Sequence, residues 1–193
     1  AVVSFDLETL KTDELKHRPR GLFGPTWGKL IPILIAAEAK VINFDLIFEF
    51  SADGFRDEHG NKILSHTDLP FKAALSENED KLVLAYSAET RPAIDYEGSL
   101  SGDLGAFGII NHEPDADAVF RQIPVDIVDD NGQKHATLLG AALQRAGVQK
   151  RNRTDGIILA PAGHPEEIIP TYKLENVLDC AGSNPEALKE AFK

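Results

Sequence analysis

The sequence predicts a mixed α/β fold, with a parallel β-α-β-α-β half followed by an antiparallel hairpin and with helices packed on a mixed sheet. Near-continuous apolar runs of buried-strand length occur at residues 1–6, 41–48 and 81–86, and segments with helical spacing separate them. After residue 105 shorter runs surround a strong hairpin signal, Asp-Asp-Asn-Gly at residues 129–132. The class follows from this order of strands and helices.

Residues 7–24 follow the first strand and are rich in Lys, Arg, Pro and Gly, which is typical of a long loop, here with one helical turn near residues 12–16. A helix is expected at residues 26–39, since Thr26 can cap it and apolar residues recur at helical spacing. Pro32 predicts a kink or a late start. The strand at residues 41–48 would then pair parallel with the first strand through a right-handed crossover.

Residues 51–65 form a polar excursion that contains two glycines. A helix at residues 68–76, with apolar residues on one face, leads to the third buried strand. The second half is expected to be antiparallel. Its predicted elements are strands at 105–110, 119–128 and 157–159 and helices at 135–146, ending at Gly147, and 185–192.

Composition bounds the function. The 193 residues, 42% of them hydrophobic, describe one globular domain, and a net charge of −11 disfavours nucleic acid and anionic membranes as partners. Cys180 stands alone, so no intrachain disulfide is expected, and no run is apolar enough to span a bilayer. Because the chain contains no methionine, even at position 1, we expect a processed product or a segment excised from a longer protein.

Several motifs recur in an order and spacing that together resemble a known family. They are residues 2–6 with Leu10, Trp27 before a helix, residues 39–48, 68–75, 82–85 and 108–111, and residues 115–121 with Pro124. The strand Ala-Lys-Val-Ile-Asn-Phe-Asp, followed downstream by Asp-Ala-Asp-Ala-Val-Phe-Arg, carries the resemblance. Along nearly the whole chain the sequence resembles the CHASE2 domain, the extracytoplasmic sensory module of bacterial membrane receptors.

The resemblance implies a single sensor domain over residues 1–193 that performs no chemistry and needs no cofactor. It would lie on the periplasmic face of the cytoplasmic membrane, with transmembrane helices attached at both ends. The attached output would most often be an adenylate or guanylate cyclase, with histidine kinase, diguanylate cyclase and Ser/Thr kinase as other possibilities. The implied partners are an unknown small molecule or envelope signal, the receptor's own transmembrane and output domains, and a second copy in a homodimer.

The same resemblance suggests a set of ligand-binding or signalling residues, with no catalytic residue and no metal site. The set is Asp6, Trp27, Asp45, Asp68, Asp115, Asp117 and Arg121. Two departures weaken such a transfer, because Gly28-Lys29 stands where the family usually has an arginine, and Ala118 where it has a glycine.

The same residues also have structural interpretations. Asp6 and Asp45 each end an apolar strand, a place at the sheet edge where α/β folds position their sites. Either acid can instead cap the segment that follows it or pair with a basic residue such as Arg121. Trp27 can serve in core packing.

Two other functions stay open. Residues 5–9 (FDLET) resemble the nucleophile loop of haloacid dehalogenase-type phosphatases, in which an aspartate attacks phosphorus beside Mg²⁺. Here Asp6 would be the nucleophile and Asp126 or the pair Asp129 and Asp130 the metal acids, but Glu8 stands where that family has an aspartate. The chain can also be a structural spacer through which a receptor dimerises.

Overall fold

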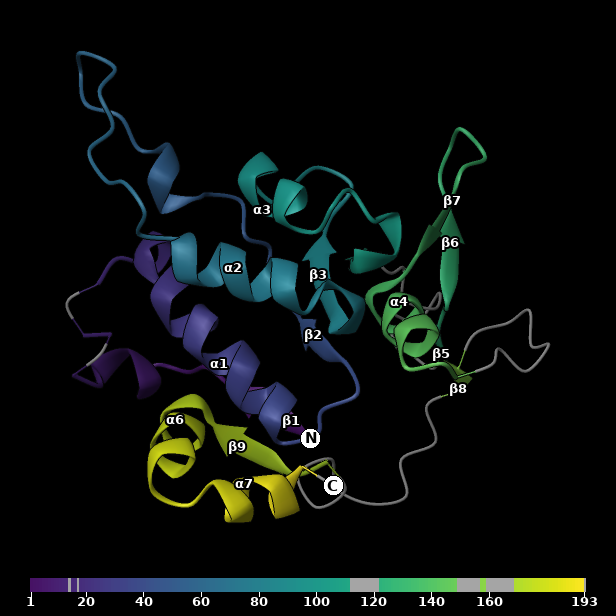
Figure 1. Ribbon diagram of the computed structural model, residues 1–193. Coiled ribbons are helices and arrows are strands. Elements are labelled where there is room, and N and C mark those ends of the chain that lie inside the picture. The colour runs from purple at the N-terminus through teal and green to yellow at the C-terminus, as the bar shows by residue number, and fades with distance from the viewer. Residues whose placement is uncertain (14, 17, 112–121, 149–156, 159–168, 193) are drawn as a thin grey trace. The chain divides into compact units, whose positions relative to one another are not determined.

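The structure is a computed structural model that describes residues 1–13, 15–16, 18–111, 122–148, 157–158 and 169–192 (Figure 1). The chain divides into two compact units. The terminal unit contains Ala1–Ala39, Ser51–Ala74 and Pro161–Lys193, and the central unit contains Lys40–Phe50 and Leu75–Ala160. Each unit has its own strands and helices.

The terminal unit is built on a two-stranded parallel sheet. Strand β1 (Val2–Ser4) pairs with β9 (Thr171–Lys173), so that Val2 lies opposite Thr171. Helices α6 (Leu174–Ser183) and α7 (Pro185–Ala191) follow β9, and α6 packs on α1 (Gly24–Ala36). Short 3₁₀ turns, η1 (Thr9–Lys11), η2 (Arg20–Leu22) and η3 (Ala52–Gly54), lie in its loops, and α2 (Leu69–Glu77) starts in this unit.

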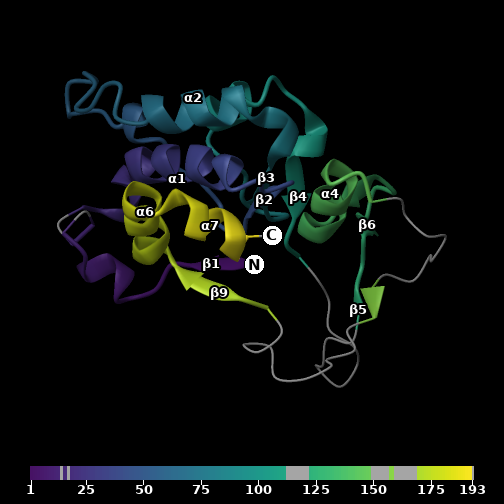
Figure 2. The same cartoon turned by 60° about the horizontal axis from the view of Figure 1, so that its bottom comes forward.

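The two chain ends lie side by side in the terminal unit, as both views show (Figures 1 and 2). Tyr172 in β9 fastens the C-terminal end, because its hydroxyl donates a hydrogen bond to the carbonyl of Ala191 (3.1 Å). Its ring also lies 5.3 Å from the ring of Phe192. Lys189 of α7 forms an ion pair with Glu38, which follows α1 (2.7 Å). The final helix is thus held to β9 and to the end of α1.

Helix α1 forms because its first turn contains Pro25, which fits a helix start, and because its apolar residues face the core. The helix starts at Gly24, so the late start allowed by Pro32 is wrong, and Pro32 lies exposed within the helix. At Gly28 the helix approaches α2 closely: a Cβ there would lie 2.6 Å from the carbonyl carbon of Pro70. A side chain at position 28 would collide with backbone.

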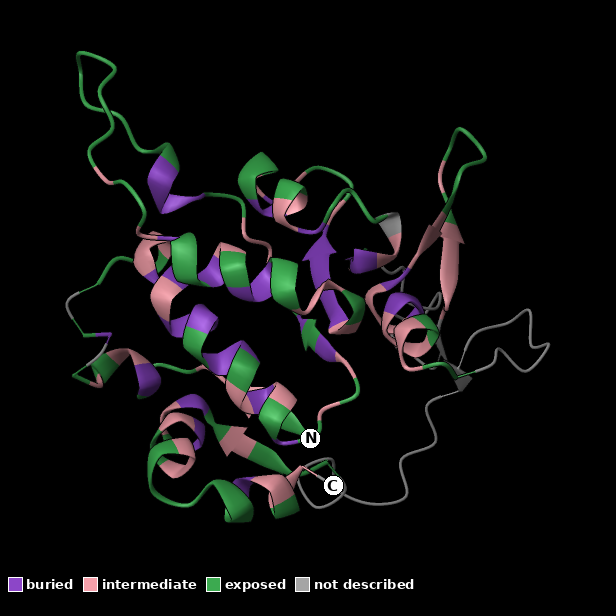
Figure 3. Ribbon diagram, in the orientation of Figure 1, coloured by how far each residue is buried: buried purple, intermediate pink, exposed green. Residues whose placement is uncertain are grey.

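The central unit contains a parallel three-stranded sheet in the order β2-β3-β4. Its strands are β2 (Ile42–Phe44), β3 (Leu82–Tyr86) and β4 (Phe107–Ile109). All five residues of β3 are buried (Figure 3), which explains the continuous apolar run in the sequence. Helix α4 (Leu138–Arg145) packs on the sheet, and only a glycine fits at Gly108, where a Cβ would lie 2.4 Å from the Cα of Leu138.

The remaining described elements of this unit are short. Strands β6 (Asp126–Val128) and β7 (Lys134–Ala136) form an antiparallel hairpin, and β5 (Gln122–Ile123) pairs antiparallel with β8 (Ile157–Ile158). The others are α3 (Ile94–Ser99), η4 (Glu79–Lys81) and η5 (Leu104–Ala106).

The mixed α/β class, the β-α-β-α-β order and the hairpin at residues 129–132 are confirmed. The hairpin turn depends on Gly132, whose φ of +79° lies in the region that favours glycine. The end predicted for the helix at residues 135–146 is also correct, whereas its start is later, at Leu138, because residues 134–136 form β7. Gly147 has φ +68°, and the N–H groups of Gly147 and Val148 return to Gln144 (3.1 Å) and Leu143 (3.0 Å).

Two predicted strand pairings are wrong. The first strand pairs with β9 instead of β2, because its partner near the other chain end completes a separate small sheet. The strand at residues 105–110 runs parallel to β3, not antiparallel, since α3 and its flanking turns carry the chain back to the same edge. The residues of α3, IDYEGS, are too few and too polar to show a helical pattern.

We predict that Gly28→Ala destabilises the terminal unit by about 1–3 kcal/mol, because the added methyl group meets the backbone of Pro70 and Phe71. Chemical denaturation followed by the fluorescence of Trp27, the single tryptophan, reports on this unit. Gly182→Ala is the matched control, since a Cβ at this exposed position of α6 meets nothing within 4 Å. Equal stability of the two variants would contradict the close packing of α1 on α2.

Candidate functional site

The carboxylate of Asp6 organises the turn that follows β1. Its Oδ1 atom accepts hydrogen bonds from the backbone N–H groups of Glu8 and Thr9, both at 2.9 Å, and from the Thr9 hydroxyl at 3.2 Å. The N–H of Thr9 is the largest cause that holds the pKa of Asp6 below its usual value. Asp6 is therefore an ionised turn residue, and the interpretation that it caps the segment after its strand is confirmed.

Thr9 links this turn to helix α6. Its side chain is buried, with 1% of the residue exposed, and its hydroxyl also lies 2.9 Å from Oε2 of Glu175, 166 residues further along the chain. One hydroxyl proton is thus offered to two carboxylates, Asp6 and Glu175. Lys173, the last residue of β9, places its ammonium group 3.9 Å from Asp6 and offsets part of the negative charge.

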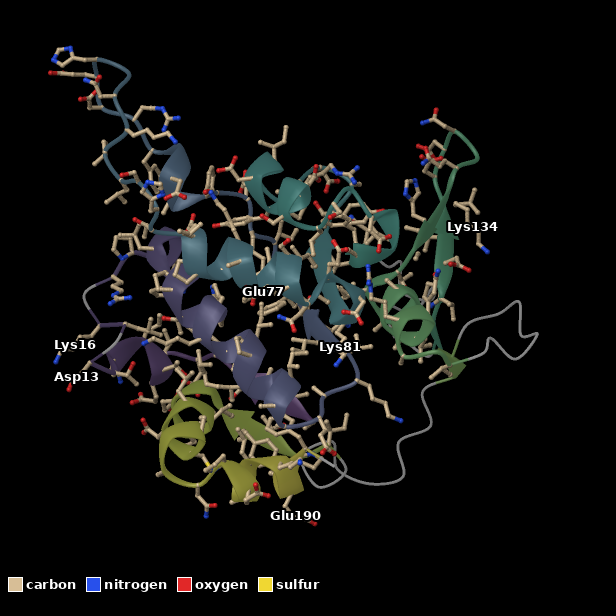
Figure 4. All side chains as sticks on the ribbon, viewed as in Figure 1. Asp13, Lys16, Glu77, Lys81, Lys134 and Glu190 are labelled. Atoms are coloured by element: carbon tan, nitrogen blue, oxygen red, sulfur yellow. The ribbon has the colours of Figure 1, made fainter. Side chains whose placement is uncertain are left out.

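A cavity of about 330 Å³ lies beside this contact, between the loop after β1 and α6. Its volume is at the lower end of the range for small-molecule sites. Its lining combines polar and apolar residues. The polar lining residues are Thr9, Thr12, Asp13, Glu175 and Asp179, and the apolar ones are Leu15, Leu174 and Leu178. Asp13 forms an ion pair with Lys16 at the surface (Figure 4).

Trp27 lies in an aromatic cluster behind β1. Its ring centroid is 5.5 Å from Phe5 and 6.5 Å from Phe23, and Phe5 and Phe23 are 5.6 Å apart, all edge to face. Only 7% of Trp27 is exposed. The cluster fixes the end of β1 on α1, so the structure gives Trp27 a packing role, and direct contact with a ligand stays a prediction.

Asp68 closes the base of the polar loop at residues 54–66. Its carboxylate is fully buried and accepts hydrogen bonds from the hydroxyl of Ser51 (2.8 Å) and from the N–H of Ala52. It also lies against Gly24 at the start of α1, where a Cβ would be 2.2 Å from Oδ1. The positive end of a helix dipole favours a carboxylate at this position.

Asp53 also joins the two ends of the loop at residues 54–66. It accepts the N–H of Thr67 (2.8 Å) and forms an ion pair with Lys72 of α2 (2.9 Å), with 10% and 20% of the two side chains exposed. Desolvation raises the pKa of Asp53, but the Lys72 ammonium and the N–H groups of Asp68 and Thr67 outweigh it, so the pKa is lowered overall. Asp53 therefore holds the base of the loop as a charged group at neutral pH.

A family model for the CHASE2 domain matches residues 2–193. The chain belongs to the CHASE2 family. CHASE2 is an extracytoplasmic, sensory and non-catalytic domain family, so the resemblance drawn from the sequence is confirmed. Searches of curated proteins and of solved structures found no significant match. Among the described residues, no helix has the length and apolarity needed to cross a membrane.

The predicted site residues of this CHASE2 domain do not form one described cluster. Asp6, Trp27 and Asp68 belong to the terminal unit, whereas Asp45 is exposed after β2 in the central unit. Asp6 and Asp45 therefore end strands of different sheets, and the expectation that both lie at strand ends of one sheet is wrong. Asp115, Asp117 and Arg121 lie outside the described residues, so pairing of Arg121 with Asp6 or Asp45 stays a prediction.

The phosphatase alternative finds its proposed acids in structural roles. Asp126 forms an ion pair with Lys134 across the hairpin (2.8 Å), and Asp129 shapes the hairpin turn. Asp6 belongs to the terminal unit and these two acids to the central unit. The membership of the chain in a sensory, non-catalytic family argues against this alternative.

Several residues of the CHASE2 site were missed in the sequence. Thr9 and Glu175 are brought together only by the pairing of β1 with β9, which local patterns do not reveal. The sequence does contain a pattern that indicates helix α6, because the apolar residues Leu174, Val177, Leu178 and Ala181 recur at helical spacing. Asp53 and Lys72 lie on opposite sides of the loop and carried no motif.

We expect Thr9→Val to destabilise the terminal unit by about 1–3 kcal/mol, because it removes a buried hydroxyl that donates to charged groups. Denaturation followed by Trp27 fluorescence measures the loss. Thr171→Val is the control, since Thr171 is exposed in β9 and its hydroxyl donates to the nearby carbonyl of Ile169. If both variants unfold like the wild type, the hydroxyl link between Asp6 and Glu175 does not hold the unit together.

Proposed function

We propose that this CHASE2 domain is the signal-receiving part of a bacterial transmembrane receptor. It would face the periplasm and connect through transmembrane helices to a cytoplasmic output domain. The output we propose is an adenylate or guanylate cyclase, the one expected most often in such receptors. One observation carries the proposal: the cavity is built from the segments that directly follow β1 and β9. β1 starts next to the N-terminal end, and β9 leads through α6 and α7 to the C-terminal end, which lies beside it (Figure 2).

The proposed mechanism is a change in the elements that hold the chain ends. A ligand shifts a receptor only if it binds one conformation better than another. A molecule in the cavity would touch Thr9 after β1 and Glu175 after β9, and so would change the contact that joins the two strands. Helix α7, held by Tyr172 of β9, would carry that change to the C-terminal end. Attached membrane helices would then move relative to each other.

The signal itself fits a small molecule with both polar and apolar parts, since threonines and acids line the cavity together with leucines. A protein or envelope signal is the other source of input. The receptor would work with its own transmembrane and output domains, and a homodimer is the expected assembly. Histidine kinase, diguanylate cyclase and Ser/Thr kinase are the other outputs proposed.

A thermal-shift screen of the purified chain against small metabolites tests the proposal. A ligand at one hundred times its Kd adds about 2.7 kcal/mol, which raises the Tm at roughly 2–4 °C per kcal/mol for a chain of this size. Leu178→Trp fills the cavity and should abolish the shift. The matched control is Asn176→Trp, because Asn176 is exposed on the same helix and does not line the cavity.

Equal loss of the shift in both variants would place the ligand elsewhere. No shift with any compound would favour a protein signal or a purely structural spacer for dimerisation. A spacer also predicts that Leu178→Trp leaves the output activity of the intact receptor unchanged.

The loop at residues 54–66 provides a second test. Residues 54–63 are exposed, whereas Ser51, Ala52, Asp53 and Asp68 at its base are buried. We therefore expect deletion of residues 54–60 to leave the fold stable, because the contacts of Asp53 and Asp68 remain. The deletion should nevertheless alter signalling in the intact receptor, measured as output activity. Unchanged signalling would rule out a signalling role for this loop.

A further inference from the structure

The side chains of Tyr86, His135 and Asp129, all titratable and all in the central unit, are joined in a row by hydrogen bonds. We call this row the hydrogen-bonded chain. The hydroxyl of Tyr86, at the end of β3, lies 3.0 Å from Nδ1 of His135 in β7. The other ring nitrogen, Nε2, lies 3.2 Å from Oδ2 of Asp129, which begins the hairpin turn. Tyr86 is buried, and 21% of the His135 side chain is exposed. These contacts tie the hairpin of β6 and β7 to the central strand of the parallel sheet.

The carboxylate of Asp129 is fixed by the turn itself. It accepts hydrogen bonds from the backbone N–H groups of Gln133 (2.8 Å) and Asn131 (3.0 Å). The N–H of Gln133, then the ring of His135, hold the pKa of Asp129 below its usual value. A charged acceptor therefore faces His135 at neutral and mildly acidic pH.

The protonation state of the His135 ring decides which groups donate and which accept in this hydrogen-bonded chain. In the neutral ring, one nitrogen donates to Asp129 and the other accepts the proton of the Tyr86 hydroxyl. In the charged ring both nitrogens donate, so the Tyr86 oxygen becomes an acceptor and its own proton must turn away. The contact with Asp129 becomes a charge-assisted pair, which is the stronger kind of hydrogen bond.

Several charged groups on neighbouring elements are paired with one another, and Asp130 adds a carboxylate next to Asp129 in the turn. Arg91 lies over the Tyr86 ring (4.9 Å) and forms an ion pair with Glu97 (3.2 Å). On the hairpin, Lys134 pairs with Asp126 (2.8 Å). Strand β4 contributes no charged residue, and Arg145 of α4 pairs with Asp103 (2.6 Å). Asp129, in direct contact with the ring, has the strongest effect on it.

We propose that His135 is a proton-sensitive latch, which mild acidification outside the cytoplasm tightens by strengthening its contact with Asp129 and turning the hydroxyl of Tyr86. Among unperturbed side chains, histidine is the one that changes its charge between pH 5 and 8. The latch is a second input, separate from the cavity of the terminal unit, and does not depend on the proposed receptor role.

The hairpin can pass this change to the sheet through Thr137, which follows β7. The Thr137 hydroxyl donates to the carbonyl of Pro124 (2.7 Å) and accepts the N–H of Gly140 in the first turn of α4 (3.0 Å). Helix α4 in turn packs on β2, β3 and β4. A tighter hairpin therefore holds the N-terminal end of the helix that covers the sheet (Figure 4 shows Lys134 on this hairpin).

Hydrogen exchange of the backbone amides of Asp129 and Gln133 tests the latch. After correction for the intrinsic exchange rate, protection should rise about two- to fivefold between pH 7.5 and 5.5, the range of a partly exposed ion pair. His135→Gln keeps hydrogen-bonding capacity without titrating and should remove the rise. His59→Gln, at an exposed position in the terminal unit, should keep it.

A titration of the His135 and Tyr86 ring resonances by NMR in the wild-type chain is a second test that needs no substitution. Both should move with the same midpoint as the amide protection. Below the lowered pKa of Asp129 the carboxylate becomes protonated, so the gain should disappear again. Flat or falling protection in the wild type, or a rise that persists in His135→Gln, would overturn the latch. A negative ligand screen would leave it unaffected.

Discussion

The pairing of β1 with β9 is the contact on which the terminal unit depends. Ser4 donates to the carbonyl of Tyr172 across a separation of 168 residues, and Val2 donates to the carbonyl of Pro170 (2.8 Å). Closing so long a loop costs conformational entropy, and three paired residues alone do not offset that cost. The aromatic cluster of Trp27 and the buried hydroxyl of Thr9 supply the further contacts around this pair.

Aspartates hold several loops of this acidic chain in place. Asp6, Asp53 and Asp68 each accept backbone N–H groups and thereby fix a loop at a defined place. A carboxylate that accepts such bonds satisfies donors that would otherwise be left unpaired. Asp6 and Asp68, which were predicted as site residues, thus support the turn beside the cavity and the loop at residues 54–66.

The central unit follows another principle. Its sheet is held by a fully buried strand, β3, and by glycines that allow α4 to approach closely. At Gly140 a Cβ would lie 1.9 Å from the carbonyl oxygen of Val125, so α4 and the segment before β6 touch through backbone. Because α4 and the segment before β6 pack this tightly, they have few alternative arrangements. A change of charge on a side chain beside them therefore acts on a stiff part of the unit. The hairpin with Asp129 and His135 lies at that edge.

The sequence by itself determined the α/β class, the helices α1, α2, α4 and α7, the buried strand β3, the hairpin turn and the CHASE2 membership. These features are recorded locally, in apolar spacing, in Gly and Asn at turns, and in motif order. Only the tertiary structure decided that β1 joins β9, that Thr9 meets Glu175, and that Tyr86, His135 and Asp129 form one chain. Such contacts join residues far apart in sequence, whose local patterns carry no information about their partners.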